Sequence, residues 1–91
     1  MGLTRRPYPR RLSEKLLQIR ERLDLSQNGM LKKLGLEEDY DRVTISGYER
    51  GEREPPLPIL LKYAEVANIC LDVLVDDGSD LPAKLPAKKR H

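Results

Sequence analysis

The feature that most constrains the fold is a set of aliphatic residues at helical spacing near the N-terminus. Leu12, Leu16, Ile19 and Leu23 follow one another at intervals of four, three and four residues. This spacing places them on one face of an amphipathic helix. The chain has 91 residues, no Trp, no Phe and four Tyr, so its core must be built mainly from such aliphatic side chains. A chain of this length holds one hydrophobic core, and we expect a single small all-α domain.

Capping residues divide the domain into five short helices. Ser26 is placed as an N-cap, and Gly35 and Gly51 are placed as left-handed terminators. Pro58 suits the first turn of a helix, and Asn68 suits the left-handed position after one. The expected helices cover residues 11–23, 27–34, 42–50, 58–67 and 71–75.

Both ends of the chain are basic, and the second half of the expected domain is acidic. Residues 1–11 carry four arginines and no acid, and residues 81–91 carry four basic side chains and no acid. Residues 37–80 carry four basic side chains against twelve acidic ones. This distribution favours a polyanion that is reached by arms rather than held by a broad basic face. We expect an extended basic arm over 1–10, the domain over 11–76 and a flexible, disordered basic tail over 77–91.

The composition argues against several classes of function. Cys70 is the only cysteine and cannot form an internal disulfide, and the only histidine, His91, ends the chain. We therefore expect no metal site and no cofactor. Without an internal histidine, a nucleophile paired with a base, or a glycine-rich phosphate loop, we expect no enzyme. No apolar run approaches the roughly 20 residues that span a bilayer, so we expect no membrane partner.

Four short motifs occur in a characteristic order in the second and later helices. They are LSQ at 25–27, LG at 34–35, TISGYERG at 44–51 and LLKYAEVANICLDVL at 60–74. In this order and spacing they resemble the Cro and lambda-repressor type of helix-turn-helix domain, the XRE family. The resemblance covers residues 12–75 and implies a compact five-helix lambda-repressor-like DNA-binding domain. It also implies a cytoplasmic, nucleoid-associated regulator, encoded by a bacterium or a phage, that binds double-stranded DNA as a homodimer and represses transcription.

The resemblance also implies which residues contact DNA, since domains of this class place their third helix in the major groove. The candidates are Gln27 on the second helix, Arg42, Val43, Thr44 and Ser46 on the third, Arg50 and Arg53 after it, and Arg5, Arg6, Arg10 and Arg11 in the arm. Arg42 is expected to bind guanine O6 and N7, and Val43 to contact a thymine methyl group. Gly47 has no side chain with which to read a base. Direct readout should therefore rest mainly on Arg42 and on DNA shape.

Several of these residues also have ordinary structural explanations. Gln27 can be an unremarkable first residue of a helix. Arg42 can pair with Asp39 or Glu38 at helical spacing. The arginines on either side of Gly51 alternate with glutamates, and this segment can be a solvated loop.

Two further positions are expected to shape the motif itself. Arg20 and Glu49 match the ion pair that joins the first and third helices in this family, which is a structural role. Leu31 stands where the family usually has Ala, in the close contact between the second and third helices. We expect Gly47 to provide the room that Leu31 takes.

Four of the five residues 37–41, the acidic insertion, are Asp or Glu, and they lie directly before the third helix. The link from Gly35 to Ile45 is about one helical turn longer than in the family. Such an insertion can lengthen the third helix without rotating its inward face, with Asp39 or Asp41 as the cap. Carboxylates near phosphate oppose DNA binding. Either one of these acids accepts from cytosine N4 in the groove, or the added turn bulges away from DNA and meets a protein partner. The alternative function is therefore a protein-interaction module on the same scaffold, such as an antitoxin or an adaptor.

Overall fold

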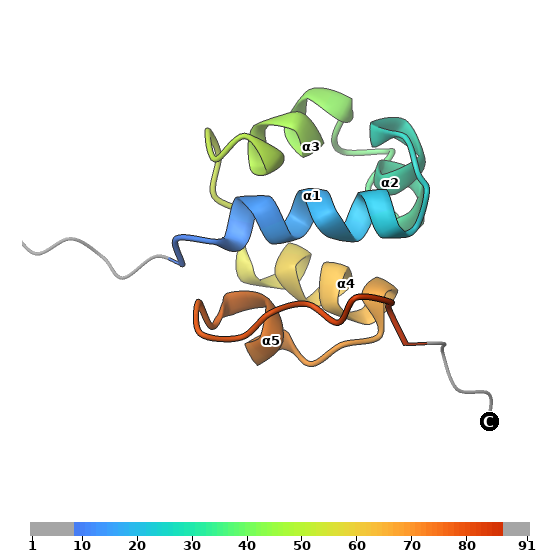
Figure 1. Ribbon diagram of the computed structural model, residues 1–91. Coiled ribbons are helices and arrows are strands. Elements are labelled where there is room, and N and C mark those ends of the chain that lie inside the picture. The colour runs from blue at the N-terminus through green and yellow to red at the C-terminus, as the bar shows by residue number, and fades with distance from the viewer. Residues whose placement is uncertain (1–8, 87–91) are drawn as a thin grey trace, which may run out of the picture.

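The computed structural model of the protein describes residues 9–86 and contains, within them, five helices and no strand. The helices are α1 (Leu12–Arg22), α2 (Gln27–Lys33), α3 (Arg42–Glu49), α4 (Leu57–Ala67) and α5 (Leu71–Val75). α1 crosses the middle of the molecule, with α2 and α3 on one side of it and α4 and α5 on the other (Figure 1). The all-α, five-helix fold expected from the sequence is confirmed. None of the described helices is long and apolar enough to cross a membrane.

The helix ends are set by the local signals expected from the sequence. The Ser26 hydroxyl accepts a hydrogen bond of 2.9 Å from the amide of Gly29 and caps α2. Gly35 and Gly51 have φ angles of 73° and 74°, and Asn68 has a φ angle of 59°. These left-handed residues end α2, α3 and α4, because a helix cannot continue through that conformation.

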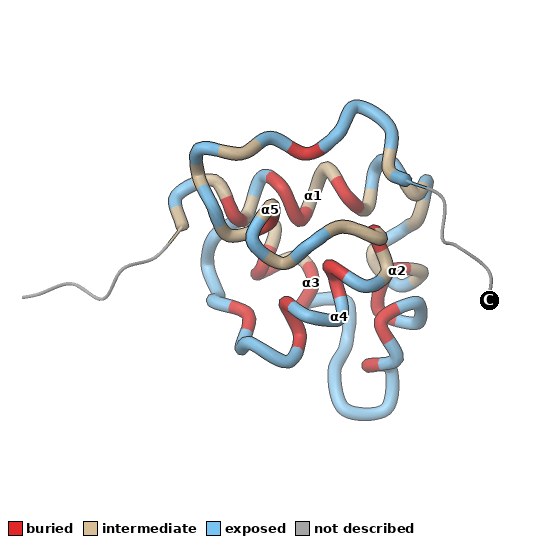
Figure 2. The backbone as a smooth tube through the Cα atoms, turned by 90° about the horizontal axis from the view of Figure 1, so that it is seen from below, coloured by how far each residue is buried: buried red, intermediate tan, exposed pale blue. Residues whose placement is uncertain are grey.

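The core is aliphatic with two tyrosines, and every helix contributes to it. Its side chains are Leu12, Leu16, Ile19, Met30, Leu31, Leu34, Leu36, Ile45, Tyr48, Ile59, Leu60, Tyr63, Ala67, Leu74 and Leu81. In Figure 2 the buried positions recur along the helices between exposed ones, which is the pattern of amphipathic helices around one core. Burial raises the pKa of the Tyr63 phenol well above its usual value, so this hydroxyl stays neutral.

A buried lysine fastens α5 to α1. The side chain of Lys15 is fully buried, and its Nζ donates to the carbonyl oxygens of Val73 at 2.8 Å and Asp76 at 2.7 Å. Carbonyl groups at the end of a helix have no partners within it. The ammonium group therefore satisfies the end of α5 and places a positive charge at the negative end of its dipole.

The structure corrects the expected start of the tail. Residues 77–86, the C-terminal segment, run along α1 in both ribbon and tube views (Figures 1 and 2). Leu81 is 7% exposed, and Leu85 packs against the core. The content of Pro, Ala and Lys correctly indicates a segment without helix, but the two leucines give it apolar surface to bury. Residues 87–91 lie outside the described residues.

The expectation that the acidic insertion lengthens the third helix is wrong. Residues 37–40 form a separate turn, in which the amides of Asp39 and Tyr40 donate to the carbonyl oxygen of Leu36 at 3.2 and 3.0 Å. Leu36 is buried and anchors this turn to the core. Asp41 then adopts an extended backbone and caps α3, accepting a 3.1 Å hydrogen bond from the second amide of the helix. Of the two aspartates considered as the cap, the structure uses Asp41.

Candidate nucleic-acid interface

The outward face of α3 is the surface expected to meet DNA. Arg42 and Arg50 on this face are exposed, Val43 is 51% exposed and Ser46 is half-buried. The opposite side of α3 is buried against the core. The fold therefore presents four of the expected contact residues on one solvent-facing stripe.

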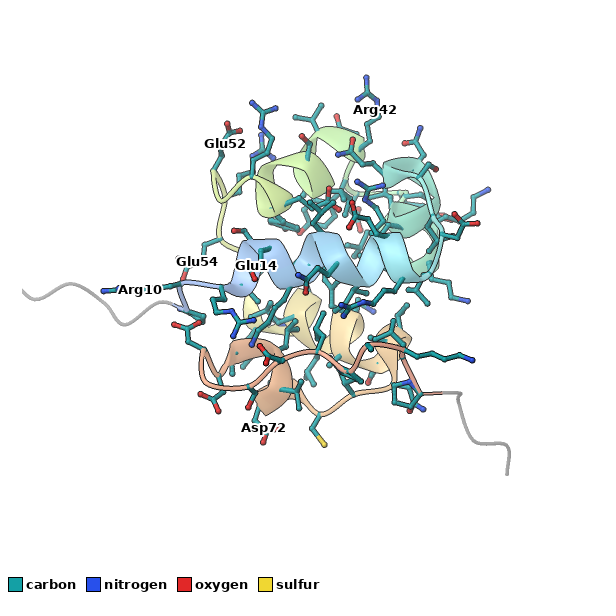
Figure 3. All side chains as sticks on the ribbon, viewed as in Figure 1. Arg10, Glu14, Arg42, Glu52, Glu54 and Asp72 are labelled. Carbon is teal, nitrogen blue, oxygen red and sulfur yellow. The ribbon has the colours of Figure 1, made fainter. Side chains whose placement is uncertain are left out.

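Arg42 projects from the N-terminal end of α3, away from the body of the molecule (Figure 3). Asp72, on α5, lies on the opposite side of the molecule. Within residues 9–86, the Arg42 guanidinium forms no ion pair with Asp39 or Glu38. The pairing with one of these acids that its spacing allows is therefore absent from the described residues. Arg42 is exposed and makes no side-chain hydrogen bond or ion pair within residues 9–86, so its five N–H donors are available to a ligand.

The ion pair expected between Arg20 and Glu49 is present. Arg20 Nε and Nη2 donate to the two carboxylate oxygens of Glu49 at 2.7 and 3.0 Å. The Arg20 side chain is 19% exposed and the Glu49 side chain 4%. The hydrogen bond to Glu49 is the main cause of the raised pKa of Arg20. A third bond, from Nη1 to the carbonyl oxygen of Leu25 at 2.9 Å, extends the network to the turn before α2.

Gln27, the first residue of α2, belongs to the same network. Its Nε2 donates to Glu49 Oε1 at 3.3 Å. The hydrogen bond to Glu49 thus orients the side chain that is expected to bind a phosphate. Because it lies at the start of a helix, free backbone amides lie beside it.

Thr44 does not lie on the outward face of α3. It is 6% exposed, and its hydroxyl accepts a long hydrogen bond of 3.4 Å from Arg53 Nη1. The sequence placed it at the edge of the DNA surface because helical spacing alone does not show how far the neighbouring loop covers a helix. In the structure its hydroxyl contacts Arg53, and a contact of Thr44 with DNA stays a prediction.

Arg50 and Arg53, which flank Gly51, have different environments. Arg50 pairs with Glu52 at 3.2 Å, and both side chains are largely exposed. Arg53 makes no ion pair within the described part of the chain, and its side chain lies across Gly47. A Cβ atom added at Gly47 would lie 2.8 Å from Arg53 Cδ and 2.9 Å from Cγ. The expectation that Gly47 makes room for Leu31 is therefore wrong, since Arg53 occupies that space.

The expected arm is tied to the domain where α1 begins. The Asp77 carboxylate accepts hydrogen bonds from the backbone amides of Arg10 and Arg11 at 2.9 and 3.0 Å. The Arg11 guanidinium donates to Asp80 at 2.7 Å, and this bond is the main cause of its raised pKa. Arg11 is thus hydrogen-bonded within the domain, and its contact with DNA stays a prediction. Arg10 points away from the body (Figure 3).

Two arm candidates, Arg5 and Arg6, lie outside the described residues.

The acidic insertion forms one wall of a shallow hollow beside the N-terminal half of α3. The hollow has a volume of about 480 Å³. It is lined by Glu38, Asp39, Tyr40, Asp41, Val43, Thr44 and Arg53. Within residues 9–86, no group of three or more His, Cys, Asp or Glu side chains is placed to hold a metal ion. The hollow instead offers one arginine, several carboxylates and the partly exposed ring of Tyr40.

Comparison with known protein families matches residues 16–74 to the helix-turn-helix family. The match covers more than half of the chain and runs from within α1 to within α5. Neither the curated proteins nor the solved structures give a match to the chain. The matched family is one of DNA-binding regulatory domains. Together with the α2 and α3 geometry, the match establishes that the chain belongs to the helix-turn-helix family of the XRE, lambda-repressor-like type.

Proposed function

We propose that the protein is a sequence-specific transcriptional repressor that binds DNA as a homodimer, with α3 in the major groove. The observation that carries this proposal is the outward stripe of α3, on which Arg42 makes no ion pair within residues 9–86, while the ion pair of Glu49 with Arg20 holds the C-terminal end of the helix. A guanidinium can bind guanine O6 and N7 at once, and an exposed Val43 can contact a thymine methyl group. These are contacts that discriminate between base pairs.

Phosphate contacts come from around this stripe rather than from a broad basic face. Arg50 and Arg10 are exposed, and the start of α2 supplies backbone amides beside Gln27. Arg5 and Arg6 belong to the proposed arm. Such contacts set the register of the domain on the duplex and make affinity depend on salt.

The homodimer is proposed to form through α5. Leu74 is fully buried, but Leu71, Val73 and Val75 are only half-buried. A second copy of the chain would cover their remaining apolar surface. Two copies related by a two-fold axis would present two α3 helices to half-sites about 34 Å apart.

Selection of duplexes from a random pool, followed by affinity measurements over a salt series, tests this function. We expect a preferred sequence with two-fold symmetry and an affinity that falls steeply as salt rises. Arg42→Ala should reduce the preference at one base pair of each half-site by roughly 10- to 100-fold. Lys62→Ala, which removes a positive charge on α4, is the matched control and should leave the preference unchanged. Binding to no duplex, or binding insensitive to salt, would contradict the proposal.

A protein-interaction module, such as an antitoxin or an adaptor, is the second candidate. The observation that favours it is the exposed acidic insertion, in which Tyr40 is 41% exposed beside Glu38 and Asp39. An aromatic ring among carboxylates suits a basic protein surface. The same selection experiment separates the two functions, because a module that acts only through protein contacts selects no preferred duplex.

A further inference from the structure

Gly47 is a buried position at the edge of the outward face of α3, one turn after Val43. The side chain that lies over this position belongs to Arg53, in the loop after the helix. We propose that Arg53 reads a base in the major groove from the place that a side chain at position 47 would occupy. The inference rests on the proposed DNA-binding function and names a further specificity-determining residue for it.

The backbone of the loop brings Arg53 back against α3. The left-handed Gly51 reverses the chain, and the amides of Glu52 and Arg53 both donate to the carbonyl oxygen of Gly47, at 2.9 and 3.1 Å. Two hydrogen bonds to one carbonyl fix where the Arg53 side chain begins. The loop therefore delivers this arginine to α3 in a defined position.

The Arg53 side chain then runs along α3 toward the N-terminal end of the helix. Its Cγ and Cδ cross Gly47, and its Nη1 reaches the hydroxyl of Thr44, one turn earlier, at 3.4 Å. It lines the same hollow as the exposed Val43. The guanidinium thus lies beside the residues that the outward face of α3 offers to base edges.

The charge of Arg53 is available to a ligand. In the described part of the chain no carboxylate pairs with it, whereas Arg50 in the same loop is paired with Glu52. Its one hydrogen bond to a side chain is at the long limit and uses one of five donors. The guanidinium group of Arg53 can therefore leave the Thr44 hydroxyl and donate to guanine O6 and N7, the acceptor pair that suits arginine.

Gly47 is what allows this placement. Any Cβ at position 47 would come within 3.0 Å of two carbon atoms of Arg53, so the arginine would have to move. The atoms in contact belong to a flexible side chain, so an alanine there can be accommodated by displacing Arg53. Alanine also favours a helix more than glycine does. Gly47→Ala should therefore fold while removing Arg53 from its position.

The test uses the full chain and the duplex that the wild type selects, with every single base-pair substitution in one half-site. Affinities are measured for Arg53→Ala, for Gly47→Ala and for the double variant, and thermal unfolding shows that each is folded. We expect both single variants to lose preference at the same one or two base pairs, by roughly 10- to 100-fold. The double variant should lose no more than Arg53→Ala alone, because Gly47→Ala acts by moving Arg53.

Arg50→Ala is the matched control, since it removes a paired arginine from the same loop. It should weaken binding to all sequences by the same factor. The inference is overturned if Arg53→Ala also weakens all sequences equally, or if Gly47→Ala keeps the full preference of the wild type. In either case Arg42→Ala still relaxes the preference at its own base pair, so the proposed function stands. A wild-type chain that selects no duplex overturns the function and this inference together.

Discussion

Glu49 is the residue through which α3 is held most directly in place. Its side chain is 4% exposed and accepts hydrogen bonds from Arg20 on α1 and Gln27 on α2. A carboxylate buried to this extent is stable only while its partners are present. The orientation of the recognition surface therefore depends on a buried polar network at the C-terminal end of α3.

Arg20→Leu should lower the free energy of unfolding by about 3 kcal/mol, because it leaves the Glu49 carboxylate buried without its main partner. The double variant Arg20→Leu with Glu49→Leu should be more stable than the single one, since no charge then remains buried. Urea unfolding followed by circular dichroism measures both differences. A loss below about 1 kcal/mol for Arg20→Leu would mean that the pair behaves like an exposed one.

The two residue pairs that organise α3 differ in how far the sequence reveals them. Arg20 and Glu49 are identified by the family motif, which fixes their spacing. The contact between Gly47 and Arg53 depends on the loop turning back at Gly51, and helical periodicity does not describe loops. The sequence contains one sign of this contact, a glycine inside a helix, which often marks a close approach of another group.

At the scale of elements, the acidic insertion adds charge next to α3 without contributing to its core. Its turn is anchored by the buried Leu36, and Asp41 caps the helix. The sequence could not distinguish this turn from a lengthened helix, because adding about one helical turn preserves the inward face in both. Leu36 decides between a separate turn and a lengthened helix. Its buried side chain keeps residues 37–40 apart from α3, which begins only after Asp41.

Neutralising the other three acids of the insertion, in the variant Glu37→Gln, Glu38→Gln, Asp39→Asn, should strengthen binding to every duplex by roughly fivefold at low salt. The base preference should not change, and the gain should shrink as salt rises. Filter binding or fluorescence anisotropy over a salt series measures this. The variant Glu65→Gln, Asp72→Asn alters acids on α4 and α5 and serves as the control. An unchanged affinity in the triple variant would show that these carboxylates lie far from the phosphates.

The start of α1 has no cap of its own, and the chain supplies one from Asp77. No side chain at the N-cap position Arg11 accepts from the helix amides. The backbone amides of Arg10 and Arg11 instead donate to the Asp77 carboxylate, and these bonds lower the pKa of Asp77, the Arg10 bond first. α1 therefore depends on a residue that follows the last helix.

This cap makes stability depend on pH in a defined direction. Because the pKa of Asp77 is lower in the folded chain than the value of about 3.9 in an unfolded one, its contribution is complete above that pH. The contribution is lost as the pH falls through the folded pKa. Asp77→Asn should therefore lower the melting temperature at pH 7, and the difference from the wild type should vanish in strong acid. Thermal unfolding over a pH series measures this, with Glu65→Gln as the control; a difference that persists in acid would contradict the role of the charge.

At the scale of the whole molecule, the C-terminal segment links the start of α1 to the end of α4. It begins at the start of α1, where Asp77 and Asp80 hold Arg11, and reaches the end of α4, where Asn68 donates to the carbonyl oxygen of Pro86 at 3.4 Å. Between these points Leu81 enters the core. The sequence predicted the domain but ended it at residue 76, since composition reports the lack of helix and not the burial of single leucines.

Truncation of the chain after residue 76 should therefore destabilise the domain, whereas truncation after residue 86 should not. The shorter chain loses the burial of Leu81, worth about 2 kcal/mol, and also the cap on α1. The longer chain keeps both and lacks only residues 87–91, which makes it the matched control for the loss of basic residues at the end. Urea unfolding of the two truncated chains and the wild type measures the difference. Equal stabilities would mean that the segment rests on the surface without supporting α1; a lower stability only for the shorter chain would extend the folding unit to residue 86.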